Sequence, residues 1–267
     1  MLSLRRSNAS SSNRSLASTP RKALTNAAYI DKHSPSDEAS TAIVLLGGKS
    51  PVDFRVRVAQ AHARDDMAPS AWSHIGVLGS RTKNPLRRSV IELPLQGKLG
   101  LGYPPATNGV VETPIGDYDD PAAFPNIAVL RVPVPFDAVD AAIAQFRQQR
   151  AVMDALELTL AWLGFVWGVG ATGNPLLAGL GVPSAAFVEY VIGAAGYDLV
   201  PGFPSRSSCP EAIWQAARWW HEFPRAASIE QSGDSAKPVT LSPISGVYDA
   251  EQYLLDPPAP ARSRRKR

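Results

Sequence analysis

The chain has 267 residues, of which 45% are hydrophobic, and a formal net charge of +3 that is unevenly distributed. Residues 1–30 and 257–267 together hold 10 of the 27 basic side chains and none of the acidic ones. The remainder therefore carries 17 basic against 24 acidic side chains, a net charge of −7. We accordingly expect no nucleic-acid partner for the folded part, although the apolar content is sufficient for a sizeable core.

Cysteine content and apolar patterning predict a cytoplasmic protein without a transmembrane segment. Cys209 is the only cysteine, so the chain has no intramolecular disulfide, which is typical of a reducing compartment. The apolar stretches near the N-terminus are too short for a secretory signal. The longest uncharged stretch, residues 158–188, is interrupted by eight Gly and Pro residues, so we interpret it as buried core rather than as a membrane span.

Three regions follow from composition and periodicity. Residues 1–40 are predicted to be a disordered N-terminal arm, 41–225 the folded domain, and 226–267 an irregular segment ending in a basic tail. Within the domain, apolar runs predict strands, 3.6-residue periodicity predicts helices, and residues 96–126 are expected to be irregular. The expected strands are 42–46, 75–78, 90–95 and 127–132, and the expected helices are 50–64, 137–149, 151–162, 184–195 and 210–223.

Motifs for nucleotides and metals are weak. Gly48-Lys49-Ser50 lies between a predicted strand and helix but lacks the glycine that opens a phosphate-binding loop. The glycine-rich stretch 168–173 follows a helix rather than a strand, which does not suit a dinucleotide site. The four histidines have no ligand-like spacing. We therefore expect neither a cofactor nor a metal.

Two ionisable residues stand on otherwise apolar strands. His74 heads the apolar run 75–78, and Glu92 interrupts the run 90–93. A carboxylate within such a strand is costly unless it is paired, and imidazole is a natural partner. We therefore predict that the two side chains lie on neighbouring strands within about 2.6–3.2 Å, as a general base and its orienting acid. The alternative is a buried pair with a purely structural role.

A nucleophile to complete this pair should come from a helix N-terminus, where the helix dipole favours an anion. Ser184 begins the predicted helix 184–195 and is the residue at such a place. His74, Glu92 and Ser184 are therefore the candidate catalytic residues.

The order of these segments resembles the circularly permuted papain-like family, the NlpC-type, YiiX-like cysteine hydrolases. The resemblance covers about residues 42–213 and lies in Trp72-Ser73-His74-Ile75-Gly76-Val77, Val90-Ile91-Glu92 and Ser184-Ala185-Ala186-Phe187-Val188. It implies an α+β fold with a small, mostly antiparallel sheet packed against helices. It also implies His74 as base, Glu92 as orienter and Ser184 at the position where the family has its cysteine nucleophile.

Three functions remain open at this point. A catalytically degenerate member would bind a peptide, acyl or lipid-like group in the cleft that is the active site of catalytic members of the family. An active amidase, peptidase or esterase would use Ser184, although a hydroxyl is much less acidic than a thiol. An interaction protein without enzymatic activity would use its basic tails as tethers. The sequence specifies neither the substrate nor the oligomeric state.

Overall fold

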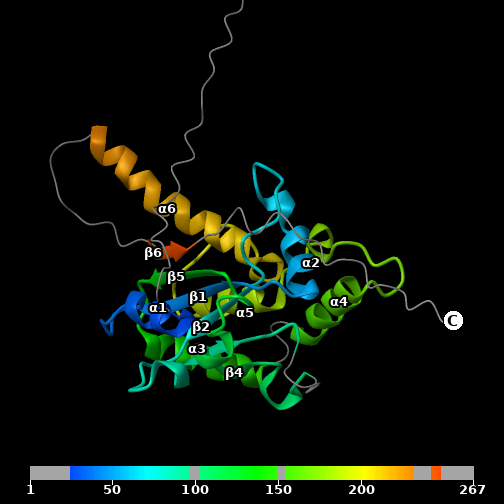
Figure 1. The fold of residues 1–267 in the computed structure, drawn as a ribbon, viewed down its shortest axis with the longest axis horizontal. Helices are drawn as coiled ribbons and strands as arrows, with labels where there is room; N and C mark the ends of the chain where they lie inside the picture. Colours follow the sequence, from blue (N-terminus) through cyan, green and yellow to red (C-terminus); the bar gives the residue numbers. More distant parts are fainter. Residues whose placement is uncertain (1–24, 97–102, 150–153, 231–241, 248–267) are drawn as a thin grey trace, which may run out of the picture.

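The fold is mixed α+β and is organised around one antiparallel sheet (Figure 1). The computed structural model describes residues 25–96, 103–149, 154–230 and 242–247. The strands lie in the order β4-β3-β2-β1-β5-β6, and every neighbouring pair is antiparallel, which confirms the predicted α+β class with an antiparallel sheet. Their bounds are β1 (Thr41–Gly47), β2 (His74–Leu78), β3 (Ser89–Glu92), β4 (Val111–Pro114), β5 (Asn126–Val132) and β6 (Ser242–Val247).

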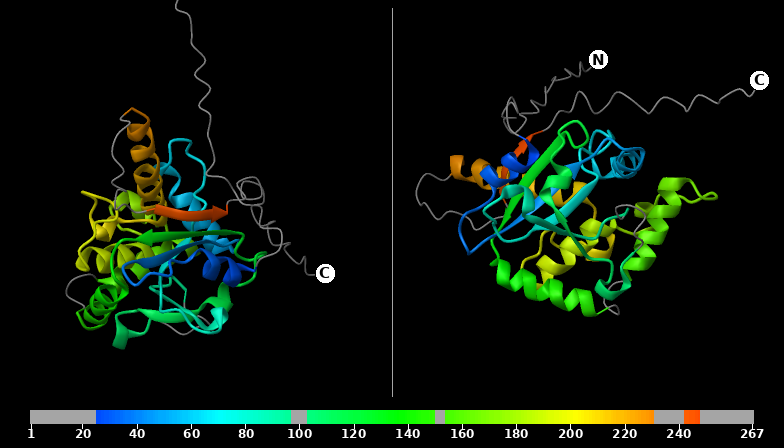
Figure 2. Two further views of the ribbon diagram at one scale, coloured as in Figure 1. Left: turned by 90° about the vertical axis from the view of Figure 1, so that its left-hand side faces the viewer. Right: turned by 60° about the horizontal axis from the view of Figure 1, so that its bottom comes forward.

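The central strand β1 is buried along its whole length because both faces of the sheet are covered. All seven of its residues are buried, and it pairs with β2 on one edge and β5 on the other. Ile43 and Leu45 belong to the larger core, which the helices after β1 complete. Val44 and Leu46 belong to a smaller core that includes α1 (Asn26–His33). Figure 2 shows α1 and the helices α3 and α5 on opposite faces of the sheet.

The helices of the larger core follow the predicted periodicity closely. In α3 (Phe136–Gln148) the buried side chains are Val139, Ala142, Ile143 and Phe146, the apolar face expected from the sequence. The other helices on this side are α2 (Pro51–Ala59), α4 (Ala155–Trp167), α5 (Pro183–Ala194) and α6 (Pro210–Glu230). A reciprocal capping box of Ser50 and Asp53 starts α2.

The helix α2 ends sooner than its sequence pattern suggests. It stops at Ala59 rather than near residue 64. The side chain of Gln60 donates to the carbonyl of Trp72 and accepts from the backbone N–H of Glu211. These long-range hydrogen bonds hold Gln60 at the end of α2, where the chain turns into a 3₁₀ segment over Ala61–Ala63.

Part of the predicted N-terminal arm is ordered. Residues 26–33 form α1, so the expectation of disorder is wrong for that segment, while residues 1–24 lie outside the described part. The Asn26 amide donates to the carbonyls of Tyr118, at 2.6 Å, and Phe124, at 3.0 Å. Ile30 is fully buried against the sheet. Long-range hydrogen bonds and buried apolar side chains thus stabilise a helix too short to be stable alone.

Two strands were missed by the sequence analysis. Strand β4 lies in the stretch expected to be irregular, and it ends in Pro114 at the edge of the sheet, where a residue without an N–H is tolerated. Strand β6 pairs with β5 although the chain beyond residue 225 shows no clear pattern. Helix α6 likewise continues past residue 223 to Glu230. These elements depend on pairing and packing rather than on local periodicity.

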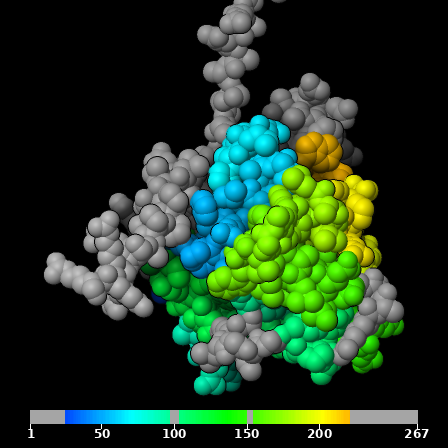
Figure 3. Space-filling model, turned by 90° about the vertical axis from the view of Figure 1, so that its right-hand side faces the viewer, coloured from blue at the N-terminus to red at the C-terminus, as the bar shows by residue number. Residues whose placement is uncertain are grey.

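The uncharged stretch 158–188 is only partly buried. Trp162 is fully buried, whereas Leu160 and Trp167 of the same helix, α4, are 59% and 63% exposed. Figure 3 shows α4 and the loop after it, in yellow-green, spread across one face of the molecule. The interpretation as core therefore holds for one side of α4. Within the described residues, no helix has the length and apolar character needed to cross a membrane.

Candidate functional site

The His74 and Glu92 side chains meet on adjacent strands. His74 is the first residue of β2 and Glu92 the last of β3, and Nε2 of His74 lies 2.6 Å from Oε2 of Glu92. The register pairs Val77 with Ile91, so His74 and Glu92 share a face on a diagonal across the two strands. The predicted proximity of the pair is confirmed, while its catalytic role stays a prediction.

Glu92 is the centre of a buried hydrogen-bond network. Its side chain is 1% exposed, and its Oε1 accepts from Thr113 Oγ1 at 2.5 Å. The Tyr118 hydroxyl donates to both carboxylate oxygens, at 2.7 and 2.8 Å. Burial, and then the charge of Glu92, raise the pKa of Tyr118 well above its ordinary value, so Tyr118 stays a neutral donor. These donors satisfy a carboxylate that would otherwise be costly to bury.

Sequence reasoning missed Thr113 and Tyr118. Thr113 lies on β4, and Tyr118 ends the 3₁₀ turn Ile115–Tyr118, both within the stretch expected to be irregular. The only local signal for Thr113 is a β-branched residue within a short Val-Glu-Thr-Pro run, which is too short to indicate a strand.

The orientation of the imidazole follows from its partner. A carboxylate accepts hydrogen bonds and does not donate them, so Nε2 of His74 carries the proton toward Glu92. Nδ1 is then the ring nitrogen with the free lone pair, and the structure gives it no hydrogen-bond partner among the described residues. The ring lies 6.2 Å from the Tyr118 ring at an interplanar angle of 25°, and the side chain is 14% exposed. His74 is therefore an oriented base with some access to solvent.

Ser184 lies in the first turn of α5, the helix that packs against β2 and β3. The segment before it is fixed by backbone hydrogen bonds from Gly181 to the carbonyl of Arg206 and from Val182 to that of Ser208. A Cβ at position 181 would come within 2.4 Å of the Ser208 carbonyl oxygen, which explains the glycine there. The sequence thus places Ser184 at a helix start, as predicted.

The Ser184 hydroxyl is isolated. The residue is 1% exposed, and its Oγ has no hydrogen-bond partner in the part of the chain that the structure describes. It is therefore not hydrogen-bonded to His74. The structure brings two of the three candidate residues together and leaves the third without a base in hydrogen-bonding contact.

A second buried carboxylate lies further along the same helix. Glu189 is 3% exposed, accepts from the backbone N–H of Val200 at 3.0 Å, and accepts from Ser208 Oγ at 3.2 Å. Burial raises its pKa to about 7. Glu189 thus joins α5 to the same Ser208 whose carbonyl fixes the start of the helix, a connection that the sequence pattern did not indicate.

The only cysteine is not a nucleophile in this arrangement. Cys209 is buried, and burial raises the pKa of its thiol to about 12. It therefore stays protonated near neutral pH, and a thiol rather than a thiolate is a poor nucleophile.

No family model matches the sequence, and comparisons of the chain with curated proteins and with solved structures gave no match. The resemblance to the permuted papain-like family therefore remains a prediction carried by the segments around His74, Glu92 and Ser184.

Proposed function

We propose that this chain is a permuted papain-like hydrolase fold that has lost catalysis and binds a peptide, acyl or lipid-like group in the ancestral cleft. Three features support the arrangement. A strand headed by an imidazole, β2, pairs with a strand ending in its acid, β3. The helix with the nucleophile position, α5, comes late in the chain and packs on both strands.

The isolation of Ser184 is the observation that supports lost catalysis. A serine becomes a nucleophile when an adjacent base takes its proton, and it must be reachable by the substrate. The Ser184 Oγ has neither a hydrogen bond to a base nor appreciable exposure within the described structure. An active site that suits a thiolate–imidazolium pair does not supply the stronger base that is needed to remove the proton from a serine hydroxyl.

The binding capacity that remains is polar and directional. Nδ1 of His74 can accept a hydrogen bond from an amide N–H, or donate one when the ring is protonated. In the first turn of α5, Pro183 has no N–H, and the N–H groups of Ala185 and Ala186 already donate to the Val182 carbonyl. A peptide or an acyl amide supplies an N–H for Nδ1 of His74 beside an apolar chain, which is why a peptide or acyl group is the proposed ligand class.

An active hydrolase is the second candidate, and the intact His74–Glu92 pair is the observation that favours it. The two proposals are separated by a fluorophosphonate probe, which labels activated serines. We expect wild-type protein to be labelled no more than Ser184→Ala, measured by gel fluorescence of the purified chain. Labelling that depends on both Ser184 and His74 would contradict lost catalysis and establish the hydrolase.

Restoring the thiol tests whether the base still serves the nucleophile position. In a Cys209→Ser background, Ser184→Cys should react with iodoacetamide no faster than Cys209 does in the wild type, because position 184 is 1% exposed and His74, which pairs with Leu46, lies on the α1 side of the sheet. Adding His74→Ala should leave this rate unchanged. The measurement is the rate of mass increase near neutral pH.

Two controls accompany that experiment. Unchanged melting temperatures show that the variants fold, and denatured protein gives the intrinsic rate of each thiol. A thiol at position 184 that reacts at least about tenfold faster than Cys209 and is slowed by His74→Ala would mean that the base still serves this position, and it would favour the active hydrolase.

A further inference from the structure

A cavity of about 440 Å³ lies at the other end of the strands that carry the candidate site. It is lined by Ala42 near the start of β1 and Leu78 at the end of β2, whereas His74 begins β2 opposite Leu46. Four residues separate His74 from Leu78, about 13 Å along a strand. The cavity is therefore distinct from the His74–Glu92 pair, and its volume falls within the range of small-ligand sites.

One side of the cavity is cationic. Arg88 lines it and is 5% exposed. Its Nε donates to the carbonyl of Gly79 at 2.7 Å, and its Nη1 donates to Ser34 Oγ at 2.8 Å. Both partners are neutral, and Arg88 forms no salt bridge with any described residue. Burial, followed by the nearby charge of Arg81, lowers the pKa of Arg88 to about 10.

Arg81 extends this cationic side toward solvent. Its Nη2 donates to the carbonyls of Asp31 and Ser34, and its Nη1 lies 3.6 Å from the Asp31 carboxylate. One half-buried carboxylate, that of Asp31, thus lies near two guanidinium groups, one of which is almost completely buried. A buried cation without a close counter-ion is costly, and a bound anion would offset that cost.

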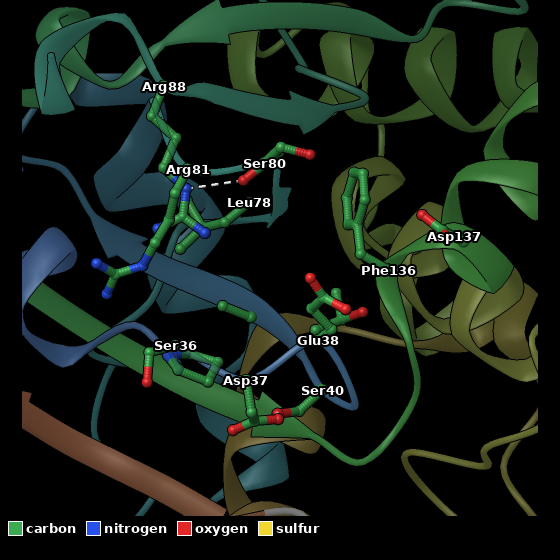
Figure 4. Close-up of a pocket in the computed structure, with 14 residues that line it drawn as sticks. Ser36, Asp37, Glu38, Ser40, Leu78, Ser80, Arg81, Arg88, Phe136 and Asp137 are labelled. Carbon is green, nitrogen blue, oxygen red and sulfur yellow. Dashed lines mark hydrogen bonds between the residues drawn. The ribbon is translucent and has the colours of Figure 1, made fainter. Parts of the chain in front are cut away.

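The other side of the cavity is acidic. Glu38 and Asp137 line it, both are exposed, and neither carboxylate has a hydrogen-bond or ion-pair partner among the residues that the structure places. Asp37 also lines it but is engaged with Ser40 and with Arg131 at 2.9 Å. Figure 4 shows the guanidinium groups on one side of the cavity and the carboxylates of Glu38 and Asp137 on the other. Apolar surface from Leu78 and Phe136 lies between them.

We propose that this cavity binds a small zwitterion: an amino acid or short peptide whose carboxylate lies against Arg88 and Arg81 and whose ammonium group lies against Glu38 and Asp137. The apolar side chain of the ligand would contact Leu78 and Phe136. Guanidinium–carboxylate pairing gives direction as well as affinity, because two parallel N–H groups match two oxygens. The inference does not depend on the proposed function, since it concerns separate residues at the opposite end of β2.

The test is calorimetric titration of the full chain with the dipeptides Ala-Phe and Ala-Leu in three forms: with free termini, with an acetylated N-terminus and with an amidated C-terminus. The form with free termini should bind, and each blocked form should bind at least about tenfold more weakly, because each loses a charge-assisted contact. The double variant Glu38→Gln/Asp137→Asn should weaken binding of the free form to a similar extent without affecting the N-acetylated form. Both substituted positions are exposed, so this variant is expected to fold.

Matched controls separate the cavity from other effects. Asp140→Asn changes an exposed carboxylate on α3 that does not line the cavity, and it should leave affinity unchanged. Loss of dipeptide binding in His74→Ala would assign that binding to the cleft of the proposed function, and it would overturn the present proposal. Equal binding of free and blocked dipeptides would overturn the proposal, and so would the absence of binding by either free dipeptide up to about 10 mM.

Discussion

Replacing Glu92 with alanine is expected to lower the free energy of unfolding by about 3–5 kcal/mol, because the change removes one partner from a buried ionic network. His74, Thr113 and Tyr118 all direct polar atoms at the Glu92 carboxylate. Without the carboxylate, the polar atoms of His74, Thr113 and Tyr118 lose their acceptor. Water cannot readily replace these hydrogen bonds at a buried position. The loss is measured by urea unfolding followed by tryptophan fluorescence.

The matched variant is Glu92→Gln, which keeps the shape of the side chain. Its carbonyl oxygen can still accept from Thr113 and Tyr118, and its NH2 group can donate to Nε2 of His74 in the other imidazole tautomer, so the charge and one acceptor position are lost. We expect it to cost about 1 kcal/mol, the net value of a typical hydrogen bond. If alanine proved no more destabilising than glutamine, the network would contribute little to stability, and its preservation would have to be explained by binding or catalysis.

Stability should fall as pH rises across the range in which Glu189 ionises. The pKa of this buried carboxyl is raised from 4.5 to about 7, so the folded state holds a proton that the unfolded state releases. Folding is then favoured at low pH, and stability is lost as pH rises from about 4.5 to about 7. The pKa difference corresponds to about 3 kcal/mol.

The isosteric variant Glu189→Gln isolates this contribution from the other carboxylates. A glutamine can accept from the Val200 N–H and donate to Ser208 Oγ, and it never ionises. Near pH 4 the variant should match the wild type closely, and near pH 8 it should be more stable by about 3 kcal/mol. The difference between the two urea unfolding free energies at each pH is the quantity to measure. A difference that does not change with pH would show that Glu189 ionises normally in the folded protein.

Elements whose local pattern agrees with their packing could be predicted from the sequence. The run Ala42–Leu46 is uniformly apolar, and it forms a strand covered on both faces. The apolar face of α3 recurs at helical spacing and is the face that is buried. The contact between His74 and Glu92 was predictable for a related reason. Each is an ionisable residue in an apolar strand, and burying it costs free energy unless the two side chains pair.

The remaining features depend on partners far away in the chain. Helix α1 is short and only weakly amphipathic, and its position follows from Asn26 reaching the carbonyls of Tyr118 and Phe124. Tyr118 itself lies in a segment rich in Gly, Pro and Asp, so nothing local indicates that it holds Glu92. Ser184 was placed at a helix start correctly, but its burial depends on the surrounding core.

The position of β1 at the centre of the sheet also affects how the chain is made. Synthesis completes β1 at Gly47, but its partner β5 is complete only at Val132, and α5 only at Ala194. At ~5–20 residues per second, a strand with seven buried positions waits several seconds on the ribosome before its second edge is paired. The strand that is best protected in the finished molecule is therefore among the most exposed during synthesis, when aggregation or chaperone capture competes with folding.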